Sequence, residues 1–317
     1  MTSNGLKVLF MGTPQFAVPT LDALLASRHT VVGVITQPDR PRGRGQKETA
    51  GPVKARALEA GLTVLQPDTL KAPDVLEAMR ALGADIGVVA AFGKILSQTV
   101  LDIPRLGMIN VHASLLPRWR GAAPIHRAVI AGDARTGVTI MRVVKALDAG
   151  AMLATVERPI GPADTSEDVE QDLAALGATL LVEVLDRLAV GPVEEIPQDE
   201  SLVTYAHRLT KEDGVIDWAR PAEAIHNQIR GLHPWPHAFA YLEGQRLILW
   251  RSTWSAESAS AAPGTVLNAQ GDSLSVATGA GTLHITELQA EGRRASGTRE
   301  FLAGRKLVPG SRFTAQP

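Results

Sequence analysis

The chain has 317 residues, of which 45% are hydrophobic and 21% charged, and its formal net charge is −1. This length favours two domains over a single core, and the balanced charge excludes a polycation that binds nucleic acid through bulk electrostatics, while leaving room for a local basic patch. The absence of cysteine excludes disulfides, thiolate catalysis and thiolate metal sites, and we expect a cytoplasmic protein. We see no signal peptide and no apolar run long enough to span a bilayer, so no membrane partner is expected.

The first half of the chain alternates short apolar runs with segments of helical periodicity. Strands are expected at 7–11, 31–36, 62–65, 85–91, 108–112, 137–144 and 152–158. Helices are expected at 15–26, 53–60, 72–81, 124–131 and 167–188. This alternation predicts an α/β domain with a mostly parallel sheet that helices cover on both faces. Ligands of such sheets bind beyond the carboxyl ends of the strands.

The pattern changes in the last third of the chain. A segment rich in proline and acidic residues, 191–199, is typical of a linker. Helical stretches are then expected at 201–209 and 222–231, followed by strands at 238–242, 246–254, 264–267, 273–277 and 282–288. Short strands separated by glycines predict a small β-barrel or sandwich. We therefore expect a first domain at 1–190, a linker at 191–206 and a second domain at 207–317.

The first turn argues against a dinucleotide-binding site. Gly12-Thr13-Pro14 follows the first expected strand, where a nicotinamide or flavin enzyme carries G-x-G-x-x-G. The other glycines of that fingerprint are missing, and Pro14 removes one amide donor. A nicotinamide-dependent dehydrogenase is therefore disfavoured.

The connection after the second expected strand is long, basic and rich in glycine and proline. Six basic side chains stand against Asp39 and Glu48 here, namely Arg40, Arg42, Arg44, Lys47, Lys54 and Arg56. Its prolines oppose a helix, and its length exceeds that of ordinary connections in compact domains. One interpretation is a solvated surface loop. The other is a cationic arm for a polyanion, because arginine can bind phosphate through two parallel hydrogen bonds.

The most informative motif runs from Asn110 to Gly121. Asn110 and His112 are two residues apart, so on a strand they face the same side. An amide and an imidazole there, with Asp148 on a later turn, fit stabilisation of an oxyanion combined with movement of a proton. The alternative is a strand-end histidine and a turn aspartate without a catalytic role, which a lone histidine would favour and this combination does not.

Three more histidines, His226, His233 and His237, cluster around a Pro-Trp-Pro segment. A metal site is one interpretation. Prolines flank His233 and His237, and we expect no carboxylate partner near them, so a loop packed by aromatic rings is favoured. Trp218, Trp250 and Trp254 either stack nucleic-acid bases or, as we expect for most of them, pack in the core of the second domain.

Nearly the whole chain resembles the methionyl-tRNA formyltransferase family. The segments that carry the resemblance are Val8–Ala17, Gln37–Arg40, Asn110–Pro117, Leu147–Gly150 and Ile229–Pro236. The Ser-Leu-Leu-Pro segment and the Asn/His/Asp trio are shared by the wider group of formyltetrahydrofolate-using enzymes and so indicate the reaction class. The Gly-Thr-Pro-x-Phe start, the basic loop and the second domain indicate the tRNA enzyme. Ala149 stands where the family often has threonine or glutamate.

The resemblance implies a Rossmann-like formyltransferase domain followed by an OB-like β-barrel that binds tRNA. It implies formyl transfer from 10-formyltetrahydrofolate to the α-amine of initiator methionyl-tRNA, without a metal ion. By position, the catalytic residues become Asn110, His112 and Asp148. The folate-contacting residues become Ser114, Leu115, Leu116 and Pro117, and the tRNA-contacting residues become Arg40, Arg42, Arg44 and Lys47. We expect a monomer.

Two other interpretations stay open at this point. Formyltransferases that act on an amino-sugar nucleotide or on glycinamide ribonucleotide share the same trio. A non-catalytic RNA-binding module would also combine a basic loop with a β-barrel, although the intact trio disfavours it.

Overall fold

The computed structural model describes residues 5–42 and 47–317, and for residues 40–42, 47 and 48 it describes the backbone alone. Its internal contacts separate the chain into two compact units. The first unit comprises Met1–Pro124, Arg135–Pro159 and Glu170–Ala206, and the second comprises Ile125–Ala134, Ile160–Val169 and His207–Pro317.

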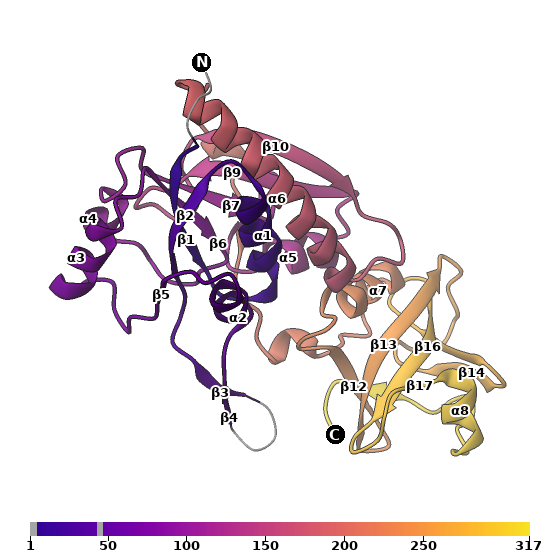
Figure 1. The fold of residues 1–317 in the computed structure, drawn as a ribbon. Helices are drawn as coiled ribbons and strands as arrows, with labels where there is room; N and C mark the ends of the chain where they lie inside the picture. Colours follow the sequence, from indigo (N-terminus) through magenta and orange to yellow (C-terminus); the bar gives the residue numbers. More distant parts are fainter. Residues whose placement is uncertain (1–4, 43–46) are drawn as a thin grey trace. The chain divides into compact units, whose positions relative to one another are not determined.

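A seven-stranded sheet forms the centre of the first unit (Figure 1). Its strands are β1 (Lys7–Gly12), β2 (Thr30–Ile35), β5 (Val64–Leu65), β6 (Ile86–Ala90), β7 (Met108–His112), β9 (Arg135–Arg142) and β10 (Met152–Pro159). Their order across the sheet is β10-β9-β7-β6-β1-β2-β5. The neighbouring strands β7, β6, β1, β2 and β5 pair in parallel, whereas β9 is antiparallel to both of its neighbours, β7 and β10. The predicted mostly parallel sheet is confirmed.

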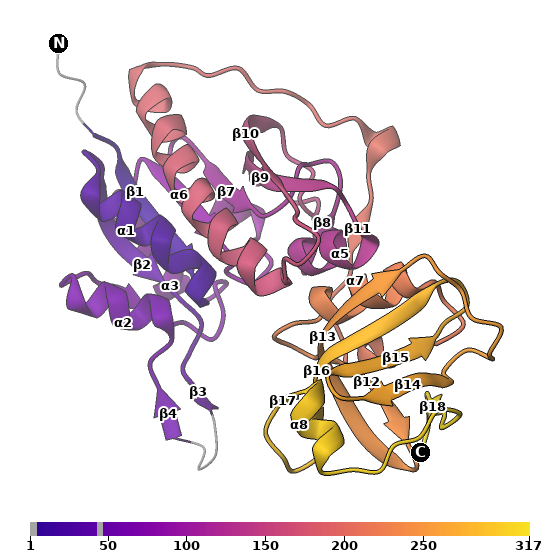
Figure 2. The same ribbon diagram turned by 90° about the vertical axis from the view of Figure 1, so that its right-hand side faces the viewer.

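Helices cover both faces of this sheet, because its strands are apolar on both sides. They are α1 (Val18–Ala26), α2 (Pro52–Glu59), α3 (Pro73–Ala81), α4 (Gln98–Leu101) and α6 (Ser166–Val190). Leu9 of β1 packs in one buried cluster with Met79 of α3 and Leu101 of α4. On the opposite face α1 and α6 lie side by side (Figures 1 and 2). Gly177 permits α6 to approach β7 closely, because a Cβ there would lie 2.7 Å from Val111.

The expected helix at 15–26 is split. Gln15–Ala17 form a 3₁₀ turn, η1, and α1 begins only at Val18. Pro19 stands in the first turn of α1, where its missing amide proton costs nothing, so the sequence favours a new helix start at this point.

The order of the strands creates a reversal beside β1. After β1 the chain moves outward to β2 and β5, then returns to the other side of β1 with β6 and continues to β7. Crevices beyond the carboxyl ends of strands at such a reversal are the usual ligand sites of open α/β sheets. His112 is the last residue of β7 and so lies at this edge of the sheet.

Two short strand pairs complete the first unit. In the basic connection, β3 (Arg40–Arg42) pairs antiparallel with β4 (Lys47–Thr49). Arg44 lies outside the described residues, and the side chains of Arg40, Arg42 and Lys47 also lie outside them. At the base of this hairpin, the Asp39 carboxylate forms an ion pair with Lys54 and accepts a 3.0 Å hydrogen bond from Gln66.

The second pair joins β8 (Arg120–Gly121) in parallel with β11 (Tyr205–Ala206). A helical stretch at 201–209 was expected, and this prediction is wrong. Glu200–Leu202 form only a short 3₁₀ turn, η2, before the chain extends into β11. The physical reason is long-range: the Arg120 amide donates to the Thr204 carbonyl and the Ala122 amide to the Ala206 carbonyl, at 2.9 and 2.8 Å.

The second unit is built on an antiparallel sheet that curls. Its strands are β12 (Ala238–Leu242), β13 (Gln245–Ser255), β14 (Val266–Gln270), β15 (Ser273–Ala277), β16 (Thr282–Ala290), β17 (Ser296–Gly297) and β18 (Phe313–Thr314). Its helices are α5 (Pro124–Ala131), η3 (Glu212–Gly214), α7 (Ala222–Gly231) and α8 (Thr298–Ala303). A bridge between Thr265 and Arg312 links the two ends of the strand order, β14 and β18. The expected small β-barrel is thereby confirmed.

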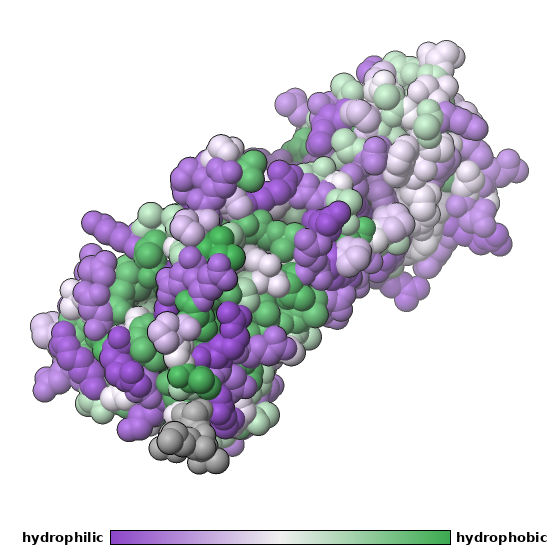
Figure 3. Space-filling view, turned by 90° about the horizontal axis from the view of Figure 1, so that it is seen from above, coloured by the Kyte–Doolittle hydropathy of each residue, from purple (hydrophilic) through white to green (hydrophobic). Residues whose placement is uncertain are grey.

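Apolar side chains fill the interior of the chain, and the surface mixes polar and apolar residues. Trp218 is 5% exposed and packs against Phe313, with ring centroids 5.2 Å apart, as expected for a core residue. Figure 3 shows hydrophilic and hydrophobic residues interspersed over the visible face. Across the described ranges, no helix combines the length and the apolar character that crossing a bilayer requires.

Candidate active site

The end of β7 presents two polar side chains on one side of the strand. Asn110 and His112 alternate with Val111, which points toward α6 on the opposite face. His112 is only 5% exposed, and Asn110 is partly buried. Strand β9 pairs with β7 along this stretch, with Asn110 opposite Met141 and His112 opposite Thr139. The sequence-based expectation that both side chains share a face agrees with this register.

The two ring nitrogens of His112 have different neighbours. Nε2 lies 3.1 Å from the backbone carbonyl oxygen of Trp119, and Nδ1 lies 3.7 Å from Oδ2 of Asp148. A carbonyl can only accept a hydrogen bond, so this contact places a proton on Nε2. In the neutral ring Nδ1 then carries the free lone pair. In the protonated ring Nδ1–H faces the carboxylate, which interacts favourably with the positive charge.

Asp148 reaches this position from a turn between β9 and β10. Its Oδ2 accepts a 2.9 Å hydrogen bond from the Gly121 amide. Its backbone has a φ of 45°, in the left-handed region that aspartate tolerates better than most residues. The turn also runs close to β9, since a Cβ at Gly150 would lie 1.8 Å from the carbonyl oxygen of Arg142. The structure therefore brings Asp148 beside His112 through a tightly fixed turn.

The segment Ser114–Pro117 follows His112 directly and is held by Thr139. The Thr139 hydroxyl donates to the Ser114 carbonyl at 2.7 Å and accepts from the Leu116 amide at 3.1 Å. Ser114 is fully buried, and its hydroxyl donates to the Arg118 carbonyl at 2.7 Å. Leu116 is also buried, whereas Leu115 and Pro117 are partly exposed. The Ser114 hydroxyl thus closes the turn that this segment makes.

Sequence reasoning assigned no role to four residues that surround the trio, although three of them lie inside the motif that ends at Gly121. Trp119 offers its carbonyl to His112, and Gly121 offers its amide to Asp148. Arg120 and Gln198 form a chain of hydrogen bonds that ends on the Asp148 backbone. The contacts made by Trp119 and Gly121 use backbone atoms, so the residue type at these positions does not reveal them. The polar run that begins at Gln198, inside an expected linker, was the one available signal.

The three histidines of the second unit do not form a metal site. His233 and His237 pack on Trp250, with ring centroids 5.4 and 4.3 Å away, which confirms the aromatic loop. The expected lack of a carboxylate is wrong, because Glu167 Oε2 lies 3.1 Å from His233 Nε2. No group of three metal-ligating side chains occurs in the part of the chain that the structure describes.

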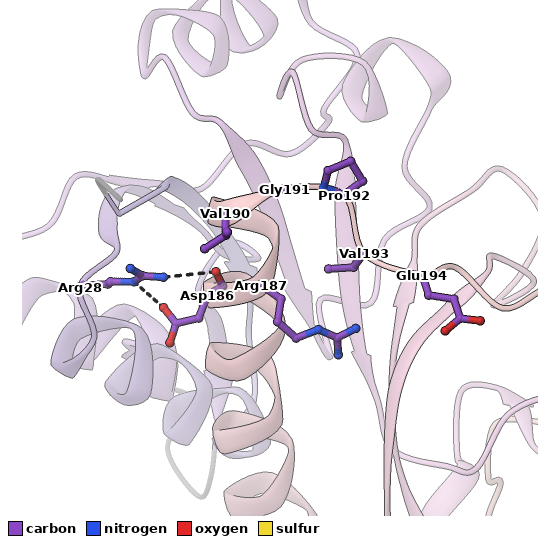
Figure 4. A pocket seen from close by; sticks show the side chains of 8 residues that line it. All are labelled: Arg28, Asp186, Arg187, Val190, Gly191, Pro192, Val193 and Glu194. Atoms are coloured by element: carbon purple, nitrogen blue, oxygen red, sulfur yellow. Dashed lines mark hydrogen bonds and ion pairs between the residues drawn. The ribbon is translucent and has the colours of Figure 1, made fainter. Parts of the chain in front are cut away.

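A hollow on the first unit lies apart from these residues (Figure 4). It borders the end of α6, where Arg28 Nε contacts Asp186 at 2.5 Å. Val190, Val193 and Glu194 also line it, and no member of the trio does. We assign it no part in the chemistry.

Comparison with known protein families matches both parts of the chain. The model described as "Formyl transferase" matches residues 6–185. The model described as "Formyl transferase, C-terminal domain" matches residues 208–306. Together they cover the sheet that carries the trio and most of the curled sheet.

Similar solved structures confirm the fold. An N-formyltransferase from Helicobacter canadensis, solved with folinic acid and dTDP-3-aminofucose, superposes with a TM-score of 0.66 at 16% identity, covering 90% of this chain and 99% of that one. HypX from Aquifex aeolicus, solved with tetrahydrofolic acid, gives a TM-score of 0.63 at 17% identity, covering 94% of this chain and 47% of that one.

Curated relatives are far more similar in sequence. The methionyl-tRNA formyltransferase of Citrifermentans bemidjiense is 48% identical over 97% of this chain and 96% of the relative. The protein of the same name from Methylobacillus flagellatus is 49% identical over 97% of this chain and 99% of the relative. Identity at this level over almost the full length of both proteins shows that this chain belongs to the methionyl-tRNA formyltransferase family.

Proposed function

We propose that this enzyme transfers the formyl group of 10-formyltetrahydrofolate to the free α-amine of initiator methionyl-tRNA, with Asn110, His112 and Asp148 as its catalytic residues. The observation that carries the proposal is the convergence of these residues at the carboxyl end of β7. There Nδ1 of His112 lies 3.7 Å from the Asp148 carboxylate, in a chain 46–49% identical to curated methionyl-tRNA formyltransferases.

The donor set fits the chemistry of a formyl group. Attack of an amine on the formyl carbon turns the carbonyl oxygen into an oxyanion. The Asn110 amide supplies an N–H donor for that oxygen, and protonated His112 adds positive charge beside it. Removal of one such donor typically costs about 3 kcal/mol of transition-state stabilisation. The trio contains no activated serine or cysteine, and the amine is a sufficient nucleophile by itself.

Proton transfer completes the reaction, because the attacking amine loses a proton and the departing folate nitrogen gains one. The contact with the Trp119 carbonyl occupies Nε2 of His112, so Nδ1 is the nitrogen that exchanges protons. Asp148 compensates the charge of the imidazolium, because its carboxylate lies beside Nδ1, and it fixes the orientation of the ring. Burial of His112 excludes water that would weaken both interactions.

The remaining parts of the chain serve the substrates. We assign folate contacts to Ser114, Leu115, Leu116 and Pro117. We assign contacts with the acceptor end of tRNA to Arg40, Arg42, Arg44 and Lys47. In this scheme residues 1–190 carry the chemistry, 191–206 link, and 207–317 bind tRNA. The enzyme acts as a monomer in the cytoplasm, and sedimentation equilibrium checks the monomer.

A single assay tests the function. The protein is incubated with 10-formyltetrahydrofolate and, in separate reactions, methionyl initiator tRNA, an amino-sugar nucleotide or glycinamide ribonucleotide. We expect formylmethionyl-tRNA in the first reaction and no product in the other two. Formylation of either small nucleotide in preference to the tRNA would overturn the assignment. Absence of transfer to every acceptor would indicate a binding module without catalysis.

A further inference from the structure

A glutamine from the expected linker touches the turn that carries Asp148. Gln198 Nε2 donates to the backbone carbonyls of Asp148 and Gly150, each at 2.8 Å. The Gln198 side chain is partly buried, although most of its neighbours in the chain are exposed. One amide group therefore ties together the two carbonyls that flank the centre of this turn.

A buried arginine determines how that amide is oriented. Arg120 is 3% exposed, and its Nε donates to Oε1 of Gln198 at 2.9 Å. Its Nη2 and Nη1 donate to the two carboxylate oxygens of Glu200 at 2.7 and 3.3 Å. Because a guanidinium can only donate, the amide oxygen of Gln198 must face Arg120. The amide nitrogen must then face the turn, where it finds two acceptors.

The turn needs such support because its conformation is not the one an isolated chain prefers. The left-handed region is unfavourable for a residue other than glycine, and such a conformation persists only where its surroundings impose it. Asp148 has a φ of 45°. The Gly121 amide fixes its carboxylate from one side, and Gln198 fixes its backbone from another.

We propose that Gln198, oriented by Arg120, is a positioning residue that holds the Asp148 carboxylate against His112 during formyl transfer. This rests on the catalytic role proposed above for Asp148. Adjacent residues of β8 then act together on the same aspartate, because Gly121 binds its carboxylate while Arg120 fixes its main chain through Gln198. Displacement of a catalytic group by about 1 Å can cost about 100-fold in rate.

The sharpest test is Gln198→Glu, because it keeps the shape and the contact with Arg120. It replaces the donating amide nitrogen with an oxygen that repels both carbonyls. We expect kcat to fall by about 10-fold to 100-fold, while KM for methionyl-tRNA and for the folate stays within about twofold. Gln198→Met removes the same donors without adding charge and should lower kcat in the same direction. Glu194→Gln, an exposed change on the same segment, serves as the matched control and should leave kcat unchanged.

A double-mutant cycle separates positioning from a general loss of structure. In an Asp148→Asn background, Gln198→Glu should cost little more, because the carboxylate that it positions is already gone. Full kcat in both Gln198 variants, with Asp148→Asn impaired, would overturn the proposal and leave the proposed function intact. Equal losses from Gln198→Glu in both backgrounds would overturn it as well. Wild-type turnover by Asp148→Asn would instead refute the catalytic role on which the inference rests.

Discussion

The proposed chemistry of His112 depends on the atoms that contact its two ring nitrogens. The carbonyl of Trp119 occupies one ring nitrogen, and the carboxylate of Asp148 faces the other. Both neighbours have backbones in the left-handed region, with φ of 65° and 45°. Backbone conformations of this kind cluster at functional sites, where surrounding structure imposes them. The tautomer and the orientation of the ring are therefore properties of the folded segment.

Removal of either polar side chain that acts with His112 should abolish most of the activity and spare the fold. We expect Asn110→Ala and Asp148→Ala each to lose at least about 100-fold in kcat, because each removes an interaction that strengthens in the transition state. Steady-state kinetics with methionyl-tRNA measures the loss, and circular dichroism checks the fold. Near-wild-type turnover by both variants would remove them from the mechanism.

A histidine outside the trio should make stability depend on pH. Burial, with a smaller contribution from the neighbouring Arg127 charge, lowers the pKa of His126 from 6.5 to about 4. As the pH falls from 6.5 toward 4, the unfolded chain binds a proton that the folded chain excludes, so the free energy of unfolding decreases. The free energy of unfolding lost through this residue is at most about 3 kcal/mol. Above pH 6.5 the imidazole is neutral in both the folded and the unfolded chain, so none of this stability is lost.

The variant His126→Gln, which cannot titrate, should flatten that dependence. Urea unfolding at pH 7, 6 and 5 measures the slope for the variant and for the wild type. The same change at the exposed His207 controls for the loss of one imidazole. Parallel curves for His126→Gln and wild type would contradict the assignment.

At the scale of an element, a hydroxyl from β9 holds two backbone groups of the turn after β7. Thr139 is fully buried and satisfies one carbonyl and one amide of the segment Ser114–Pro117. Valine has the same shape and would leave both backbone groups without a partner. An unsatisfied buried polar group costs about 1–3 kcal/mol.

We therefore expect Thr139→Val to lower the free energy of unfolding by about 2 kcal/mol or more and to raise KM for the folate. Strand β9 offers a matched control. Thr136 is 2% exposed, and its hydroxyl has no hydrogen-bond partner among the residues that the structure describes. Thr136→Val should leave stability unchanged or improve it. Equal losses of stability in the two variants, measured by urea unfolding, would refute this explanation.

The sequence predicts those elements that follow from local pattern. Apolar runs place β1 and β7 within a residue of their observed ends, and alternation places Asn110 and His112 on one face. Local sequence pattern fails where hydrogen bonds with a segment distant in the sequence determine the secondary structure. Tyr205 lies in a strand rather than a helix because β8, far away in the sequence, supplies its hydrogen bonds. Gln198 was missed for the same reason.

At the scale of the molecule, the basic hairpin should govern affinity for tRNA and not for folate. We expect Arg42→Ala to raise KM for methionyl-tRNA with little change in folate binding. The variant lacks a guanidinium that would neutralise a tRNA phosphate, so fewer counterions are released from the tRNA on binding. The slope of log K against log salt should become shallower by about 1. Titrations over a range of salt concentrations measure this slope.

An arginine elsewhere on the first unit provides the control for this prediction. Arg135 is exposed on β9 and pairs with Glu157 at 3.1 Å. Arg135→Ala should leave the salt dependence unchanged. An Arg42→Ala enzyme with wild-type KM and salt slope would exclude this residue from the tRNA contact.

The pairing of β8 with β11 has a consequence for how the enzyme is made. A ribosome that has translated as far as Val190 has already produced Asn110, His112 and Asp148. It has not yet produced Gln198, which binds the Asp148 turn, nor the Thr204 and Ala206 carbonyls, which accept hydrogen bonds from the amides of Arg120 and Ala122. A nascent chain of that length contains every strand of the large sheet and still lacks the residues that hold the Asp148 turn and β8 in place. If Gln198 has the positioning role proposed above, we expect competence for formyl transfer to arrive late in translation, when residues 191–206 join the rest of the first unit.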